Sequence, residues 1–237
     1  MKYLISFLFL ALAFTMKSEA KVALPSILGD NMVLQQQAEV KLWGKARPNA
    51  TVTVKTSWNG QTYKSSSDAK GGWSLTVSTP VAGGPYQITF NDGELLTLQN
   101  VLIGEVWFCS GQSNMEMPMG GFDRQPVRGT NDIIAKAKPS TPIRMYTTDS
   151  KDGRWVRQFS KTPQEDCQGE WLENTPVNVS HISAVSYYFA RYIQEELEVP
   201  VGIVVSTWGG SKVEAWMSRE SIKPFSSIDL SILDNDA

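Results

Sequence analysis

The chain has 237 residues, of which 41% are hydrophobic and 19% are charged, and its formal net charge is −2. This balance excludes a disordered segment, a polybasic nucleic-acid-binding protein and a disulfide-dense miniprotein. A single histidine, His181, excludes a histidine-rich metal site, and we expect neither a metal ion nor a cofactor. Any mechanism that needs a histidine base must use His181 or lack that base.

Residues 1–20 (MKYLISFLFLALAFTMKSEA) have the pattern of a secretory signal peptide. Lys2 is a short positive region, residues 3–14 are apolar, and residues 18–20 form a small-x-small cleavage site. The apolar run is too short to span a bilayer comfortably, and no later stretch approaches the roughly 20 apolar residues of a transmembrane helix. We therefore expect a secreted or periplasmic protein that does not contact a membrane after cleavage. An uncleaved N-terminal anchor is the alternative.

Residues 21–100 consist of short stretches in which apolar and polar residues alternate. Residues 51–55 and 73–77 are examples, and turn sequences such as Asn59-Gly60 and Gly83-Gly84-Pro85 separate them. No helical period interrupts this pattern. The segment is therefore predicted to be a β-sandwich-like domain.

The pattern changes at residue 101. Residues 101–109 form a nearly continuous apolar run, as in a strand that is buried on both faces. Residues 182–197 place apolar side chains on one helical stripe, and residues 201–205 form a second buried strand. Strand, helix and strand in this order predict an α/β domain with a parallel sheet over residues 101–237. The chain stops without a helix-stop or turn signal, so we expect this domain to be truncated.

The two cysteines lie in different surroundings. Cys109 ends an apolar strand pattern, whereas Cys167 lies in a polar loop. One disulfide bond is compatible with export, but a secreted disulfide scaffold carries many more cysteines. Two free thiols are the favoured interpretation.

Two loops follow the two buried strands, and ligand sites of open parallel sheets lie beyond the carboxyl ends of their strands. The first loop, residues 110–115, reads SGQSNM, and the second, residues 206–211, reads STWGGS. A serine after a buried strand suits a nucleophile, although serine and asparagine also cap helices. The first loop is not a G-x-S-x-G elbow, because position 115 is methionine, and it is not a phosphate loop.

The other polar candidates each have a structural alternative. Gly209-Gly210 forms either a tight turn or an oxyanion-hole donor, and Glu214 suits a solvated helix face. Trp216 suits a core or interface position. His181 precedes a predicted helix without a neighbouring carboxylate, which is typical of a helix start or a surface residue.

Together the two loops resemble a known family. GEVWFCSGQSNMEMPM (Gly104 to Met119) resembles the nucleophile block of the sialate O-acetylesterase family, secreted carbohydrate esterases of the SGNH/GDSL hydrolase superfamily. VGIVVSTWGGSKVEAW (Val201 to Trp216) is similar to the second block, and LPSILGDNMVLQQ (Leu24 to Gln36) is similar to the opening of the family's β domain. The resemblance implies a flavodoxin-like α/β/α fold for residues 101–237. It also implies a serine esterase that removes O-acetyl groups from sialic acid or related sugars through an acetyl-serine intermediate.

The resemblance also implies roles for individual residues. Ser113 matches the nucleophile, and its own N–H contributes to the oxyanion hole. Gly210 matches the second oxyanion donor, with Gly209 as the near alternative. Gln112, Asn114 and Trp208 flank these positions and are candidates for substrate contacts. The family's third donor and its Asp-x-x-His pair have no counterpart, so we expect the 237-residue form to be inactive or nearly so.

Two other functions stay open. One is deacetylation of another polysaccharide, such as xylan or pectin. The other is a non-catalytic carbohydrate-binding module, in which Trp43, Trp58 and Trp73 form a sugar-stacking platform. Tryptophan in a small β-sandwich is, however, more typical of the core.

Overall fold

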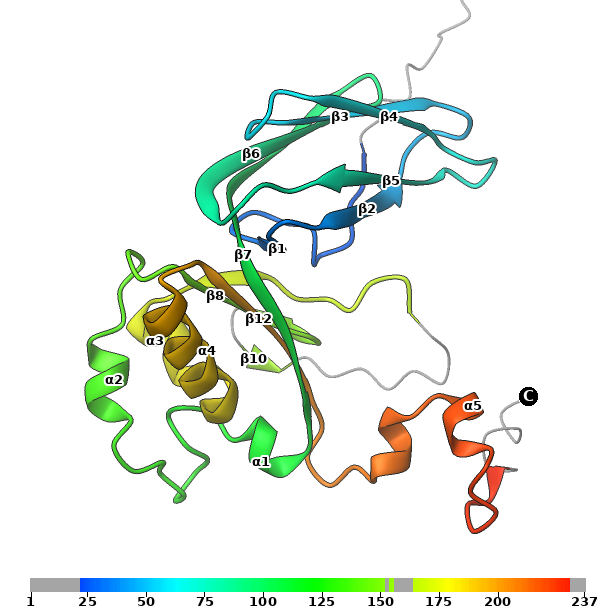
Figure 1. The fold of residues 1–237 in the computed structure, drawn as a ribbon. Coiled ribbons are helices and arrows are strands. Elements are labelled where there is room, and N and C mark those ends of the chain that lie inside the picture. The colour runs from blue at the N-terminus through cyan, green and yellow to red at the C-terminus, as the bar shows by residue number, and fades with distance from the viewer. Residues whose placement is uncertain (1–21, 152–153, 156–163, 231–237) are drawn as a thin grey trace, which may run out of the picture.

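The computed structural model describes residues 22–151, 154–155 and 164–230. The predicted signal peptide therefore lies outside the described residues. The fold is mixed α/β, as predicted, and an eight-stranded sheet runs through it (Figure 1). Over the described ranges, no helix combines the length and the apolar character needed to cross a membrane.

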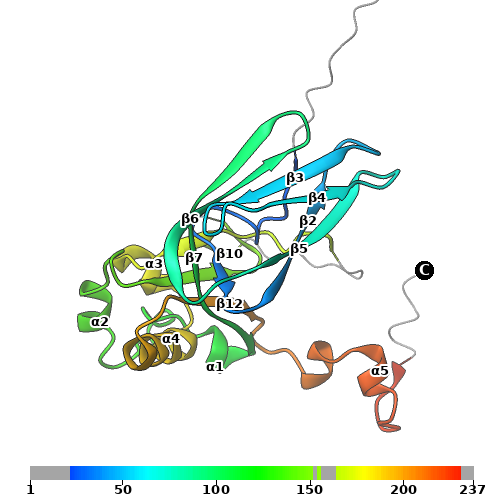
Figure 2. The same ribbon diagram turned by 45° about the horizontal axis from the view of Figure 1, so that its top comes forward.

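The strands in chain order are β1 (Val33–Gln35), β2 (Glu39–Lys45), β3 (Thr51–Thr56), β4 (Thr62–Ser66), β5 (Gly72–Ser78), β6 (Gly83–Asn91), β7 (Leu95–Gly111), β8 (Ile143–Thr147), β9 (Ser150–Lys151), β10 (Arg154–Trp155), β11 (Trp171–Glu173) and β12 (Val201–Thr207). The helices are α1 (Ser113–Glu116), α2 (Asn131–Ala135), α3 (Pro176–His181), α4 (Ala184–Leu197), the 3-10 helix η1 (Val213–Trp216) and α5 (Arg219–Ile222). The segment after β12, which includes α5, extends away from the sheet (Figure 2).

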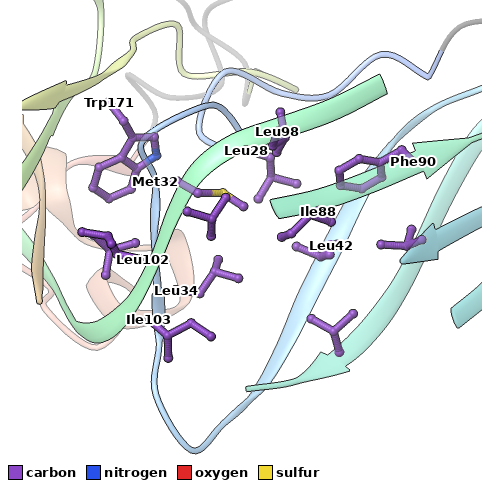
Figure 3. Packing of buried hydrophobic residues seen from close by; sticks show 14 of the residues in the cluster. Leu28, Met32, Leu34, Leu42, Ile88, Phe90, Leu98, Leu102, Ile103 and Trp171 are labelled. Carbon is purple, nitrogen blue, oxygen red and sulfur yellow. The ribbon is translucent and has the colours of Figure 1, made fainter. Parts of the chain in front are cut away.

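The N-terminal part consists of two sheets that enclose a core. Strands β2 and β5 pair with each other, and β4, β3, β6 and β7 follow one another in the large sheet. Alternate residues of these strands point inward, so Leu42, Ile88 and Phe90 meet between the sheets (Figure 3). The period-2 pattern of the sequence thus corresponds to one buried face for each sheet. The β-sandwich class and the domain limits stay predictions.

The three tryptophans of the hypothetical sugar platform do not share a surface. Trp73 lies in the core, and Trp58 is half-buried with its ring edge-on to Tyr86 at 5.8 Å. Trp43 is 38% exposed. A continuous platform of three rings is therefore wrong, because β2 and β5 turn Trp43 and Trp73 to opposite faces.

Strand β7 connects the two parts of the fold. Its first residues pair antiparallel with β6, and Leu102–Gly104 pair in parallel with β1. Its last seven residues pair in parallel with the whole of β12. The expected domain limit after residue 100 therefore falls inside one strand of 17 residues.

The α/β part has the strand order β11-β8-β12-β7. Strands β8, β12 and β7 are parallel, and β11 is antiparallel to β8, which confirms the predicted parallel sheet. Helix α4 packs on β12 and β8. Because parallel neighbours direct their carboxyl ends to one edge, the loops after β7 and β12 lie together.

Helix α4 does not bury the whole apolar stripe that the sequence shows. Val185, Phe189, Tyr192 and Leu197 are exposed, whereas Ala184, Tyr187 and Ala190 are buried. The two alanines permit close approach to the sheet, and the Tyr187 hydroxyl donates to Asn174 Oδ1 at 2.8 Å. Phe189 packs edge-on to Trp107 instead, with ring centroids 5.0 Å apart. Two small residues and one hydrogen-bonded tyrosine, rather than the whole predicted apolar stripe, form the buried face of α4.

Candidate active site

The loops that follow β7 and β12 lie against each other, as the parallel arrangement predicts. The two strands pair through Ser110 with Ser206 and Gly111 with Thr207. Beyond them, the Trp208 N–H donates to the Gly111 carbonyl oxygen at 3.0 Å. A Cβ atom placed on Gly209 would lie 3.6 Å from Ser113 Oγ. The strand ends therefore bring Ser113 and the glycine turn together.

Ser113 occupies the first position of α1, with Gln112 as the N-cap residue. The first N–H groups of a helix have no acceptor within the helix, so the Ser113 N–H is available to a ligand. Its side chain is exposed, and its Oγ lies 3.5 Å from Gln112 Oε1. Asn114 is also exposed beside it.

Helix α1 is attached to the N-terminus of α4 through Met115. The Met115 sulfur accepts hydrogen bonds from Ser186 Oγ at 3.3 Å and Ser183 Oγ at 3.6 Å. Ser183 is in turn the N-cap of α4 and accepts from the Ser186 N–H. Ser113 thus stands on a short helix that is held by a longer one.

The two glycines of the turn differ in their hydrogen bonding. The Gly209 N–H donates a short hydrogen bond to Glu116 Oε2. Gly210 has a φ of +78°, which favours glycine, and its N–H has no acceptor among the residues that the structure describes. Of the two N–H groups, Gly210's is therefore the one free for a ligand.

Glu116 is a site residue that the sequence interpretation missed. Its carboxylate joins the helix of the first loop to the turn of the second. One signal was present in the sequence, because residue 116 lies three positions after Ser113 and so about one helical turn away. Its partner, however, is 93 residues distant along the chain.

A cavity of ≈ 840 Å³ opens beside the glycine turn. Trp208, Gly209, Gly210 and Trp216 form part of its wall. The Trp216 indole N–H donates to Ser211 Oγ at 2.8 Å, and that hydroxyl donates to the Trp208 carbonyl oxygen. Trp216 is thus a cavity residue rather than a core residue, while Gln112 and Asn114 are not part of the wall.

The wall of this cavity also includes Asp166 and Cys167. Asp166 Oδ1 accepts from the Ser26 N–H at 3.0 Å and from the Ser26 hydroxyl at 2.6 Å. The Tyr146 hydroxyl lies 2.5 Å from Ser26 Oγ and 3.4 Å from Cys167 Sγ. Burial raises the pKa of Tyr146 well above its usual range, so this hydroxyl stays protonated. The contacts hold the wall to the N-terminal segment.

The described residues place no histidine imidazole in a hydrogen bond with Ser113. His181 ends α3 and is exposed, and none of the hydrogen bonds among the described residues involves its imidazole. Cys109 and Cys167 are free, as predicted, and burial raises the pKa of the Cys109 thiol. The described residues contain no group of three or more His, Cys, Asp or Glu side chains that could hold a metal ion.

Known proteins resemble the chain over most of its length. The sialate O-acetylesterases of Homo sapiens and Mus musculus are 30% and 28% identical to it over 216 and 213 residues, 84% of this chain. The crystal structure of a carbohydrate acetylesterase from Xanthomonas citri matches 86% of this chain, with a TM-score of 0.76 and 34% identity. The chain belongs to the sialate O-acetylesterase family.

The family match has a defined extent. The chain spans 39% of the human sialate O-acetylesterase, 38% of the mouse enzyme and 44% of the Xanthomonas citri chain. No family model matches the chain.

Proposed function

We propose that this protein is a serine esterase that removes O-acetyl groups from sugars, with Ser113 as its nucleophile. The approach of Ser113 Oγ to the Gly209–Gly210 turn carries this proposal. A hydroxyl near a turn whose Gly210 N–H has no acceptor among the described residues supports acyl transfer. The names of the relatives, which are acetylesterases of sialic acid and of carbohydrate, agree with it.

In the proposed reaction, Ser113 Oγ attacks the acetyl carbonyl carbon. The oxygen of the tetrahedral intermediate accepts hydrogen bonds from the N–H groups of Ser113 and Gly210. The C–O bond to the sugar then breaks, the sugar oxygen takes up the proton that Ser113 Oγ releases on attack, and water hydrolyses the acetyl-serine to acetate and free Ser113. Gly210 suits this role better than Gly209, because Glu116 already accepts from the Gly209 N–H.

The finer assignments belong to the same proposal. Trp208 contacts the sugar from the cavity wall, while Gln112 and Asn114 contact it from the exposed side of Ser113. Residues 101–237 take the flavodoxin-like SGNH arrangement, and the protein is exported by way of residues 1–20.

The 237-residue chain by itself is expected to be inactive or nearly so. A serine hydroxyl is a weak nucleophile without a base, and no hydrogen bond among the described residues joins His181 to Ser113. The measurement is nitrophenol release from 4-nitrophenyl acetate by the 237-residue chain and by its Ser113→Ala variant. Equal rates are expected, and a faster wild-type chain would contradict this expectation.

The substrate class is tested with the protein purified from its source cells. Acetate release is measured from 9-O-acetyl-N-acetylneuraminic acid and from acetylated xylan. Release from the first at the higher kcat/KM supports a sialate substrate, and the reverse order supports the polysaccharide alternative. If neither compound loses acetate, the esterase proposal fails.

Glu116→Ala is expected to lower kcat of the active protein by about 10-fold to 100-fold, less than the loss of an oxyanion donor itself. The variant removes the acceptor of the Gly209 N–H and so releases the turn that carries Gly210. Glu116→Gln is the matched control, since its amide oxygen still accepts, and it is expected to keep most of kcat. Equal losses in both variants, or none in either, would contradict a positioning role for Glu116.

A further inference from the structure

A second cavity, of ≈ 660 Å³, lies on the N-terminal part of the molecule. Trp43 on β2 and Ser74 on β5 line it, and they face each other in the register of the two strands. Both side chains are exposed, whereas Leu42, the neighbour of Trp43, is fully buried. Trp43 therefore presents its indole to the solvent side of the sheet, where it contributes nothing to the core.

The rest of the lining mixes apolar residues, among them Leu24 and Pro25, with polar ones, and its charges are of both signs. Ser65 and Ser66 of β4 add hydroxyl groups next to Ser74. The charged side chains on the wall are two lysines and three carboxylates, namely Lys41, Lys45, Asp68, Glu165 and Asp166. A polyanion such as a nucleic acid gains little from this mixture. An exposed aromatic face among hydroxyl groups suits a neutral, polyhydroxylated ligand with one apolar face.

Trp73 supplies a second and independent observation. It is 5% exposed, and its indole N–H has no acceptor among the described residues. A Cβ atom on Gly44 would lie 3.3 Å from Trp73 Cζ2, the ring atom next to the N–H edge, and both residues line the cavity. A buried donor without a partner costs free energy, and a bound water that reaches the indole N–H beneath the cavity would supply the acceptor.

We propose that this cavity, the Trp43 groove, binds a pyranose ring of a neutral saccharide chain. The apolar face of the sugar stacks on the Trp43 indole, and its hydroxyl groups bond to the surrounding serine and lysine side chains. The groove is separate from Ser113, but the two cavities share Asp166 in their walls. A saccharide chain held at Trp43 therefore lies next to the cavity that contains the glycine turn, with Asp166 between the two.

The test measures binding, which needs no turnover and so does not depend on the esterase proposal. Cellohexaose and xylohexaose are titrated into the ¹⁵N-labelled chain while the indole N–H signals are followed by NMR. We expect a saturable shift of the Trp43 signal, and binding at least 10-fold weaker in Trp43→Ala. Ser113→Ala and Trp58→Phe, which alter residues outside the groove, are expected to bind as the wild type does.

A second variant covers the case in which Trp43→Ala does not fold. Ser74→Arg places a guanidinium over the Trp43 ring from the opposite strand and removes no core contact, and it is expected to weaken binding at least 10-fold. The anionic 3′-sialyllactose is expected to bind more weakly than either hexasaccharide. The proposal fails if neither hexasaccharide gives a saturable shift up to about 10 mM. It also fails if Ser74→Arg binds as tightly as the wild type.

Discussion

Ser113→Ala is expected to lower kcat/KM by about 10⁶-fold in any form of this protein that releases acetate from a sugar. The variant removes the attacking oxygen and keeps the N–H groups of residues 113 and 210 in place. Substrate binding through the cavity beside Trp208 should persist, so KM is expected to change little. The measurement is acetate release at several substrate concentrations.

Two features make this experiment decisive. Ser113 is exposed, and among the described residues its hydroxyl makes one long hydrogen bond, to Gln112 at 3.5 Å, so the variant should melt at the wild-type temperature. Ser110, the next-to-last residue of β7, is the control serine, and Ser110→Ala is expected to retain activity. A Ser113→Ala protein with more than a few per cent of wild-type activity would remove Ser113 from the mechanism.

Glu173→Ala is expected to lower the free energy of unfolding by about 3 kcal/mol. Arg144 lies in β8 with its side chain 5% exposed, and its Nη2 is 3.2 Å from Glu173 Oε1. Burial lowers the pKa of Arg144, and the Glu173 carboxylate opposes that shift. Without the carboxylate, a buried guanidinium is left whose Nε has no hydrogen-bond partner among the described residues. We place this loss of unfolding free energy at the low end of the range for a broken buried ion pair, because the Glu173 side chain is 37% exposed.

The control for this prediction removes the charge that Glu173→Ala leaves behind. In the double variant Arg144→Met with Glu173→Ala, an apolar side chain of similar length replaces the buried guanidinium. Urea denaturation is expected to show the double variant as more stable than Glu173→Ala alone. If the two substitutions destabilise additively, Arg144 is not held by this ion pair.

The ion pair also shows what sequence patterns miss. Glu173 accepts from Asn100 Nδ2 at 3.2 Å, and Asn100 in turn donates to Asn31 Oδ1 at 2.8 Å. These contacts join β11 to the middle of β7 and to the N-terminal segment. Nothing in the local sequence of these residues distinguishes them from surface residues, because their partners are about 70 positions away.

The tryptophans show the same limit in a different way. Alternation along residues 73–77 predicts a strand, and the structure has β5 there, paired with β2. Such a pattern is compatible with either face being buried, since a shift of one residue exchanges the faces. Only the packing of the two sheets assigns Trp73 to the core and Trp43 to a groove.

The sequence by itself determined the strand-rich N-terminal part, the parallel strands β7 and β12, and the two loops at their carboxyl ends. These features depend on the spacing of apolar residues and on turn residues. Both can be read from residues that are neighbours in the sequence. The tertiary structure alone decided that Gly209 is bound to Glu116, that α4 turns its alanines to the sheet, and that Arg144 is paired while buried. Each of these depends on contacts between residues far apart in the chain. A pattern of neighbouring residues contains no information about the strength of such contacts.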